Sequence, residues 1–216
     1  MSVPSHPDFL ARLRARPLLA ILRDAPPDAL PELARCLRTA EIAFVEVALN
    51  TPDALEQIRI LKDLLQGEVE VGAGTVLSKT AAEAAHWAGA SFLVSPCLVP
   101  EVQAYARLHS LPTFPGAFTP QEIWNAHQAG ATMVKLFPAK AAGGPGYVKE
   151  LRGPFRDIPI LACGGVSAAT ARDYLDAGAQ TLAFGGSIFS PARLKARDFE
   201  GVLSDLVALS KAATTA

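Results

Sequence analysis

The sequence predicts a (β/α)8 barrel, also called a TIM barrel, that forms a single domain over residues 1–216. The first supporting observation is the length, which suits one domain and allows a substantial buried core. The second is an alternation of short apolar runs with amphipathic segments, which is typical of parallel βαβ units. The third is the number of these runs, because the sequence contains eight and a closed barrel requires eight strands.

The eight apolar runs are spread along the whole chain and define the expected strands. They are Pro17–Leu22, Ala43–Val47, Val69–Ala73, Ser91–Val94, Pro112–Phe114, Thr132–Leu136, Pro159–Ala162 and Thr181–Phe184. The expected outer helices carry apolar residues near helical spacing. They include Asp53–Gln66, Ala81–Ala88, Pro100–His109, Pro120–Gln128 and Ala168–Ala177. An N-terminal helix precedes the first strand, and a C-terminal helix covers the tail from Asp198 to Ala216.

The tripeptide Ala-Gly-Ala occurs at Ala88–Ala90, Ala129–Ala131 and Ala177–Ala179, each time between a helical segment and an apolar run. Glycine at the end of a helix adopts the left-handed backbone of a C-cap. The repeated order of helix, glycine and strand therefore supports a regular α/β barrel.

An open, doubly wound sheet is built from the same units and is the main alternative fold. Its dinucleotide loop has one candidate here, Gly72-Ala73-Gly74-Thr75. This segment lacks the third glycine of the motif, and no suitably placed acidic residue ends the next strand. We therefore favour the barrel.

Composition argues against several classes of function. Charged residues make up 19% of the chain and the formal net charge is −1, so neither nucleic acid nor a membrane is expected as a partner. Cys36, Cys97 and Cys163 lie far apart without metal-ligand spacing, so we expect no metal site. No segment approaches the length of a membrane span and the first residues lack a secretion-signal pattern, so we expect a cytoplasmic protein.

Two ionisable residues lie inside apolar strands, where a charge is costly unless it serves a purpose. Glu46 interrupts the run Phe44–Leu49, and Lys135 interrupts the run Met133–Pro138. A buried lysine has a lowered pKa, which frees the neutral amine to attack a carbonyl. Lys135 is therefore a candidate nucleophile and Glu46 a candidate catalytic carboxylate. A structural ion pair between them is the alternative.

Paired glycines follow the seventh and eighth expected strands, in Cys163-Gly164-Gly165-Val166-Ser167 and Phe184-Gly185-Gly186-Ser187-Ile188. Glycines allow backbone N–H groups to approach a phosphate, and barrels commonly bind phosphate at these two places. Either loop alone is equally consistent with a tight turn. Together they favour a phosphate site.

The ends of the third, fourth and fifth strands offer residues that can line a pocket. Thr75 carries a hydroxyl suited to a carboxylate. Pro96 and Pro115 stand at strand ends, where a purely structural role is at least as consistent with their position.

Taken together, these motifs resemble the 2-keto-3-deoxy-6-phosphogluconate (KDPG)/4-hydroxy-2-oxoglutarate aldolases, a family of class I aldolases. The resemblance runs from about Leu18 to Phe189. The segments that match the family are Val45-Glu46-Val47, Gly72-Ala73-Gly74-Thr75-Val76, Val94-Ser95-Pro96, Phe114-Pro115-Gly116, Val134-Lys135-Leu136-Phe137-Pro138-Ala139, Gly164-Gly165 and Gly185-Gly186-Ser187.

The resemblance implies cleavage of a 2-keto-3-deoxy sugar-acid phosphate to pyruvate and glyceraldehyde 3-phosphate, without metal or organic cofactor, by a homotrimer. Lys135 would form the Schiff base, Glu46 would transfer protons, and Thr75 would contact the carboxylate of the pyruvate half. The phosphate would meet Gly164, Gly165, Gly186 and Ser187 in loops that also contain Cys163 and Gly185, and Pro96 and Phe137 would shape the pocket.

Two positions depart from the family pattern, and both bear on the substrate. Asn50 replaces an arginine that holds the substrate carboxylate in some members. Arg23 matches an arginine found at the end of the first strand in other members, so we expect Arg23 to supply the missing positive charge. Cys163 stands where gluconate-specific members often carry threonine. Phosphogalactonate-cleaving relatives also lack that threonine, so the substrate is the gluco or the galacto phosphate, with 4-hydroxy-2-oxoglutarate as a third candidate.

Two other functions use the same phosphate loops. One is an isomerase or epimerase that transfers protons without a covalent intermediate. The other is a non-catalytic protein that binds sugar phosphates. A binding protein needs neither Glu46 nor Lys135, and their presence on separate strands favours the aldolase.

Overall fold

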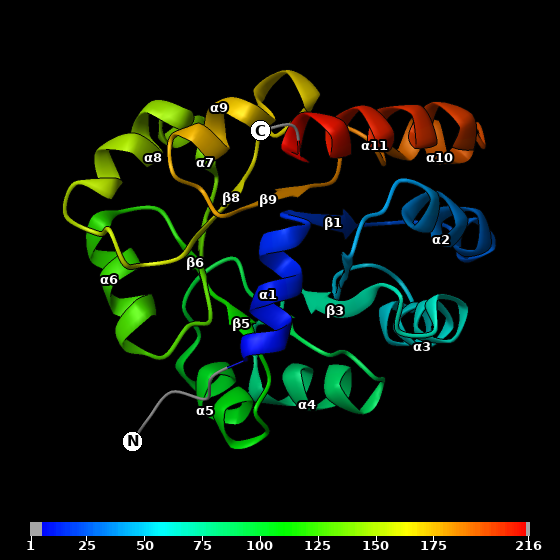
Figure 1. Ribbon diagram of the computed structural model, residues 1–216. Coiled ribbons are helices and arrows are strands. Elements are labelled where there is room, and N and C mark those ends of the chain that lie inside the picture. The colour runs from blue at the N-terminus through cyan, green and yellow to red at the C-terminus, as the bar shows by residue number, and fades with distance from the viewer. Residues whose placement is uncertain (1–5, 215–216) are drawn as a thin grey trace.

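The computed structural model describes residues 6–214 and confirms the (β/α)8 barrel (Figure 1). Within this range the strands form one parallel sheet in the order β5-β4-β3-β2-β1-β9-β8-β7-β6. The strands are β1 Leu18–Leu22, β2 Phe44–Ala48, β3 Glu70–Gly74, β4 Leu93–Val94, β5 Thr113–Phe114, β6 Gly116–Ala117, β7 Val134–Leu136, β8 Ile160–Cys163 and β9 Thr181–Phe184.

The barrel closes through the chain itself at Pro115. The two ends of the strand order, β5 and β6, are separated only by this residue. Proline has no backbone N–H to donate to a ladder, so it divides a strand into two short segments. The expected fifth strand therefore continues beyond Phe114, and the segments β5 and β6 together occupy one of eight strand positions around the barrel.

The helices surround the outer face of the barrel, apart from α1, which lies across one of its ends (Figure 1). They are α1 Pro7–Ala15, η1 Pro27–Ala29, α2 Leu30–Thr39, α3 Ala54–Leu65, α4 Lys79–Trp87, α5 Pro100–Leu108, α6 Pro120–Gln128, α7 Ala139–Ala142, α8 Pro145–Arg152, α9 Ala168–Asp176, α10 Pro191–Lys195 and α11 Phe199–Thr214. The helices expected from the sequence are confirmed, although residues 215 and 216 of the last one lie outside the described range. Among the described residues, no helix has both the length and the apolar character needed to cross a membrane.

The glycines of the three Ala-Gly-Ala segments end helices as expected. Gly89, Gly130 and Gly178 follow α4, α6 and α9 with φ angles of 103°, 90° and 105°. Backbone with such a φ is strained for residues that carry a β-carbon, so glycine ends each helix without steric cost.

The strands separate two apolar cores, one outside the barrel beneath the helices and one inside it. The inner core contains Leu19, Phe44, Phe92 and Phe114, all buried. Burial of each such side chain contributes about 1.5–3 kcal/mol to the stability of the fold. A β-carbon at Gly72 would lie 2.4 Å from the ring of Phe92, so the interior accommodates this ring only beside a glycine.

Helix α1 covers the amino end of the barrel and leaves the opposite end for a site. The ring of Phe9 on this helix lies 5.0 Å from the ring of Phe44 and 5.7 Å from that of Phe92, measured between centroids. Phe44 is the first residue of β2, which places α1 at the amino ends of the strands. The carboxyl ends, where barrels carry their active sites, form the other face.

Candidate active site

Strand alternation directs three polar side chains into the barrel interior, toward the carboxyl ends of the strands. Successive side chains of a strand point to opposite faces, so residues two apart share a face. Phe44, Met133 and Leu161 belong to the inner core. Glu46, Lys135 and Cys163, two residues further along the same strands, therefore also face the interior, near the carboxyl ends of β2, β7 and β8.

Glu46 is buried in this interior with only 2% of its surface exposed. A β-carbon at Gly74 would lie 2.3 Å from its Oε1 atom, so the carboxylate rests directly on the backbone of β3. Its buried Oε2 atom has no hydrogen-bond partner among the described residues. Burial raises the pKa of Glu46, and the positive charges of Lys135 and Arg23 oppose this rise without cancelling it.

Lys135 is also buried, with 6% of its surface exposed. Its Nζ atom lies 5.3 Å from the centre of the Phe137 ring, within the range of a cation–π contact. The ion pairs found among residues 6–214 do not include one between Lys135 and Glu46. The two side chains thus influence each other's charge without the direct salt bridge that a purely structural pair would form.

Arg23 and Thr75 meet at the ends of β1 and β3. Arg23 Nη2 lies 3.5 Å from Thr75 Oγ1, at the outer limit of a hydrogen bond. Thr75 has a φ of 57°, a left-handed conformation that is rare for a β-branched residue. Backbone strain of this kind is concentrated at functional sites, where the surrounding structure maintains it.

A cavity of about 350 Å³ opens beside these residues at the carboxyl ends of β1, β8 and β9. Seven of the residues expected at the site line it, namely Arg23, Cys163, Gly164, Gly165, Gly185, Gly186 and Ser187. The lining also includes Ile21, Asp24, Val166, Ala183, Phe184, Phe189 and Pro191. Glu46, Thr75, Pro96, Lys135 and Phe137 do not belong to this lining.

Pro96 lies against β6 instead, where its carbonyl oxygen would be 2.1 Å from a β-carbon at Gly116. The chain after β4 therefore packs tightly on the strand segment that is paired with Lys135. The backbone of Pro96, and not its ring, makes this contact.

Backbone N–H groups add to the polar lining that the side chains of Arg23, Asp24 and Ser187 give the cavity. Among residues 6–214, the N–H groups of Gly165, Val166, Gly186 and Ser187 donate to no protein acceptor. Gly164 and Gly165 have φ angles of 108° and 78°, which only glycine adopts readily. Unpaired N–H groups from two neighbouring loops form a concave site suited to an anion such as a phosphate.

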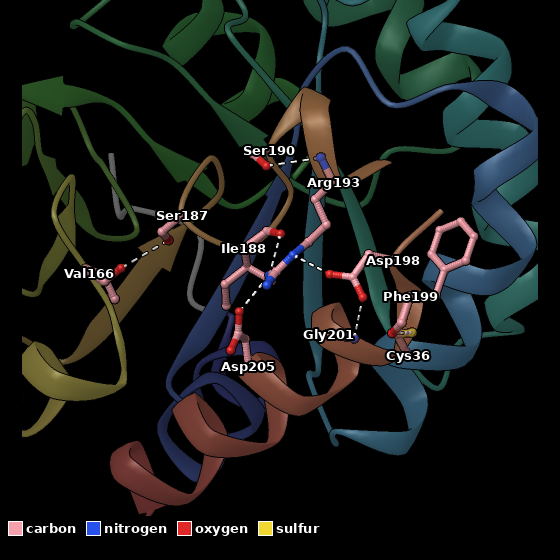
Figure 2. Close-up of polar contacts among 10 residues, drawn as sticks. All are labelled: Cys36, Val166, Ser187, Ile188, Ser190, Arg193, Asp198, Phe199, Gly201 and Asp205. Atoms are coloured by element: carbon pink, nitrogen blue, oxygen red, sulfur yellow. Dashed lines mark hydrogen bonds and ion pairs between the residues drawn. The ribbon is translucent and has the colours of Figure 1, made fainter. Parts of the chain in front are cut away.

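Side-chain contacts join the two glycine loops and tie the second loop to the helices behind it (Figure 2). Ser187 Oγ donates to the carbonyl oxygen of Val166 at 3.3 Å. Arg193 on α10 donates from Nη1 to the carbonyl oxygen of Ile188 at 3.3 Å and to Asp205 of α11 at 2.6 Å. Its Nε atom lies 3.0 Å from Asp198 Oδ2.

The thiol of Cys163 lies buried between the cavity and the interior polar residues. Burial raises its pKa, and the charges of Lys135 and Arg23 oppose the rise. The thiol is therefore neutral at ordinary pH and offers the cavity only a weak hydrogen-bonding group.

No group of three or more His, Cys, Asp and Glu residues within the described part of the chain is arranged to hold a metal ion.

A family model described as KDPG and KHG aldolase matches residues 10–204. The chain belongs to this family. A 2-dehydro-3-deoxy-phosphogluconate aldolase of Pseudomonas aeruginosa is 38% identical over 169 residues, which are 78% of this chain and 75% of the relative. A probable 2-dehydro-3-deoxy-6-phosphogalactonate aldolase of Rhizobium meliloti is 34% identical over 82% of this chain and 83% of its own length.

Among solved structures, the KDPG aldolase of Legionella pneumophila, with pyruvate captured as a covalent carbinolamine, superposes with a TM-score of 0.85. It is 25% identical in sequence, and the match covers 93% of this chain and 97% of that one.

Sequence reasoning missed contributors to the cavity that act through backbone groups. Val166 offers an N–H group, which every residue except proline possesses, so its side chain gives no signal. Tyr174 and Thr170 contact the carbonyl oxygens of the first glycine loop from α9. Their only signal in the sequence is their position in the helix that directly follows a predicted phosphate loop.

Proposed function

We propose that this single-domain chain is a class I aldolase that cleaves 2-keto-3-deoxy-6-phosphogluconate or its galactonate epimer to pyruvate and glyceraldehyde 3-phosphate. The observation that carries the proposal is a buried lysine and a buried carboxylate facing the barrel interior, beside a cavity rich in free N–H groups. Membership of the family and the covalent carbinolamine in the related structure support the same chemistry.

The reaction begins at Lys135. Its neutral amine attacks the C2 ketone, and loss of water gives a protonated imine that withdraws electrons from the neighbouring carbon–carbon bond. The C3–C4 bond breaks as Glu46, directly or through a water molecule, takes the proton of the C4 hydroxyl. Glyceraldehyde 3-phosphate leaves, and the remaining enamine is protonated at C3. Hydrolysis then releases pyruvate and restores the amine, so this sequence uses neither a metal ion nor an organic cofactor.

The pKa of Glu46 suits this role. Its rise on burial makes the carboxylate a stronger base than an exposed one, and a base with a pKa nearer to neutral transfers protons more effectively. The unpaired Oε2 atom is free to accept the proton.

The two ends of the substrate are held by different groups. Thr75 and Arg23 bind the carboxylate of the pyruvate half, with Arg23 supplying the positive charge. The loops that contain Gly164, Gly165, Gly185, Gly186 and Ser187 bind the phosphate. Two anchored ends hold the C3–C4 bond near Lys135 and Glu46, which favours cleavage by fixing the reacting atoms in position.

Substrate choice falls between the gluco and galacto phosphates because Cys163 lines the cavity where a hydroxyl would contact the sugar chain. We propose the two epimers as the candidate substrates and 4-hydroxy-2-oxoglutarate as a third candidate. Coupled assays of pyruvate release give kcat/KM for each of the three compounds and so rank them as substrates.

Trapping with borohydride tests the mechanism. Borohydride added with pyruvate reduces the imine, and mass spectrometry should locate a single pyruvate adduct on the peptide that contains Lys135. Lys135→Met should abolish the adduct and the cleavage, while Lys149→Met on α8 should retain both. An unmodified Lys135 peptide in active enzyme would favour a non-covalent isomerase. Phosphate binding without any turnover would favour a binding protein.

We further propose a cytoplasmic homotrimer. Trp87 and Leu108, on α4 and α5, are 78% and 79% exposed and present apolar surface suited to contact with another copy. The three cysteines are unpaired, as is usual in a reducing compartment. Light scattering after gel filtration tests the trimer, and a monomeric mass would contradict it. Cell fractionation tests the location.

A further inference from the structure

We propose that Tyr174 and Thr170 are positioning residues for the phosphate end of the site. Their hydroxyl groups hold the carbonyl oxygens of the first glycine loop away from the cavity, so that the amides of Gly165 and Val166 face it. This inference rests on the proposed function. It assigns part of the affinity for the phosphate group to two residues that do not touch the substrate.

Two donors hold the carbonyl oxygen of Gly164. It accepts a hydrogen bond from Tyr174 Oη at 3.3 Å and another from the backbone N–H of Lys140 at 3.1 Å. In a planar trans peptide the C=O and the following N–H point in opposite directions. Donors that fix this oxygen on one side therefore turn the N–H of Gly165 to the other side, where Gly165 lines the cavity.

The next peptide unit is fixed in the same way by Thr170. Its Oγ1 donates to the carbonyl oxygen of Gly165 at 3.0 Å and accepts from the N–H of Ser167 at 3.0 Å. The contact with Gly165 is shorter than the two competing contacts of the same hydroxyl, which reach the carbonyl oxygen of Ser167 at 3.4 Å and Ser167 Oγ at 3.2 Å. Holding the Gly165 oxygen turns the N–H of Val166 toward the cavity that Val166 also lines.

The hydrogen bonds from Tyr174 and Thr170 matter because glycine loops are intrinsically flexible. Two consecutive glycines have access to many backbone conformations, and their ordering costs free energy whenever a ligand has to impose it. Hydrogen bonds made before the ligand arrives remove that cost from binding. The unpaired state of the Gly165 and Val166 N–H groups is consistent with a site organised in advance for an anion.

Tyr174 is suited to a permanent role as a donor. Its ring is 2% exposed and packs in the outer core beneath α9. Burial, followed by the negative charge that Cys163 would carry as a thiolate, raises the pKa of the phenol, which therefore keeps its proton. Neither Tyr174 nor Thr170 lines the cavity, so each acts through the loop and not by contact with the phosphate.

Hydroxyl deletion tests the inference. Tyr174→Phe and Thr170→Val should each raise KM for the phosphorylated substrate, and the inhibition constant of inorganic phosphate, by about five- to tenfold, as expected for one neutral hydrogen bond. The value of kcat and the extent of pyruvate trapping on Lys135 should change less than twofold. The same holds for kcat and KM with 4-hydroxy-2-oxoglutarate, because this substrate lacks a phosphate. Thr170→Ser keeps a hydroxyl and should retain parental phosphate inhibition.

Tyr147→Phe is the matched control. Tyr147 Oη donates to the carbonyl oxygen of Phe118 at 2.9 Å, so this variant loses the same kind of hydrogen bond, but to a carbonyl oxygen that belongs to neither glycine loop. Its inhibition by inorganic phosphate should equal that of the parent enzyme.

The inference is overturned if the inhibition constant of inorganic phosphate is unchanged in Tyr174→Phe and Thr170→Val, or if Tyr147→Phe weakens it equally. Loss of activity toward phosphorylated and unphosphorylated substrates in equal measure also overturns it, because that result indicates a general structural role. Failure of pyruvate trapping in the parent enzyme refutes the aldolase mechanism alone, since phosphate binding by parent and variants is measured independently of turnover.

Discussion

The carboxylate of Glu46 lies so close to Gly74 that a β-carbon at position 74 would be 2.3 Å from Oε1 and 2.7 Å from Cδ. Gly74→Ala should therefore displace the carboxylate and lower kcat by about 100-fold, since small misplacements of a reacting group are costly. Pyruvate trapping on Lys135 should persist. Gly146→Ala is the control, because a β-carbon there meets no atom within 4 Å and lies in α8. Equal kcat values for the two variants would contradict the positioning of Glu46 by β3.

Glu46→Gln should lower kcat by about 10²- to 10⁴-fold, the usual contribution of a general acid or base. The variant should still form the trapped pyruvate adduct. Glu83→Gln, on the exposed face of α4, should keep parental activity. Undiminished turnover in Glu46→Gln would remove Glu46 from proton transfer.

The same substitution predicts a pH-dependent difference in stability. Burial raises the pKa of Glu46 above its ordinary value of 4.5, so the folded state binds a proton more tightly than the unfolded state does. The free energy of unfolding of the parent protein therefore falls as pH rises from about 4.5 toward the raised pKa. Glu46→Gln lacks this titration. Its melting temperature, compared with that of the parent, should rise as pH increases from about 4.5 toward the raised pKa of Glu46. A constant difference would contradict the raised pKa.

The sequence was informative where function requires an unusual residue type. Glu46 and Lys135 stand out because an ionisable side chain in an apolar strand needs an explanation, and both are buried in the barrel interior. The glycine pairs stand out for the same reason, and they line one cavity. The strand count also followed from simple alternation, although Pro115 divides one strand position into β5 and β6.

Contributions made through the backbone were not predictable in this way. Val166 offers an amide that any side chain would allow, and Tyr174 and Thr170 are ordinary residues for a helix that packs on a sheet. Their importance depends on which carbonyl oxygens they reach. That relationship exists only once α9 is packed against the loop after β8.

Arg23 links the carboxylate end of the site to the pKa of Glu46. Arg23→Met should raise KM for the sugar-acid phosphate by about 10- to 100-fold, the value of a hydrogen bond to a charged group. Loss of its charge should also raise the pKa of Glu46 further, since Arg23 at present lowers it. The acidic limb of the profile of kcat/KM against pH should then move to higher pH. Arg23→Lys preserves the charge and should keep the limb in place, although KM rises because the guanidinium fork is lost. A limb that stays fixed in Arg23→Met would contradict the electrostatic link.

Cys163→Thr tests the choice between epimers. Cys163 lines the cavity and its neutral thiol is a weak hydrogen-bonding group. A hydroxyl there should increase kcat/KM for the gluco phosphate relative to the galacto phosphate by about fivefold, the value of one modest hydrogen bond. Cys163→Val, which has a similar shape and no hydroxyl, should leave the ratio near that of the parent. A ratio unchanged by threonine would indicate that the sugar chain does not approach this side of the cavity.

Arg193 should stabilise both the fold and the second glycine loop. Its side chain is 26% exposed and joins Asp198, Asp205 and the carbonyl oxygen of Ile188, next to Ser187. One partly exposed ion pair contributes little, but these contacts converge on a single guanidinium. Arg193→Met should lower the free energy of unfolding by about 1–2 kcal/mol and raise KM for the phosphorylated substrate about threefold.

Arg59→Met provides the comparison for Arg193, because Arg59 forms one exposed ion pair with Glu56 at 3.1 Å within α3. It should change the free energy of unfolding by less than about 0.5 kcal/mol and leave KM unaltered. Denaturant titration gives the two stabilities, and inhibition by inorganic phosphate reports on the loop. If Arg193→Met is as stable as Arg59→Met, the ion pairs of Arg193 contribute no more than other surface pairs. Within the turn from Gly185 to Phe189, the N–H groups of Ile188 and Phe189 both donate to the carbonyl oxygen of Gly185. If Arg193→Met loses stability without any change in phosphate inhibition, these hydrogen bonds hold the turn without Arg193.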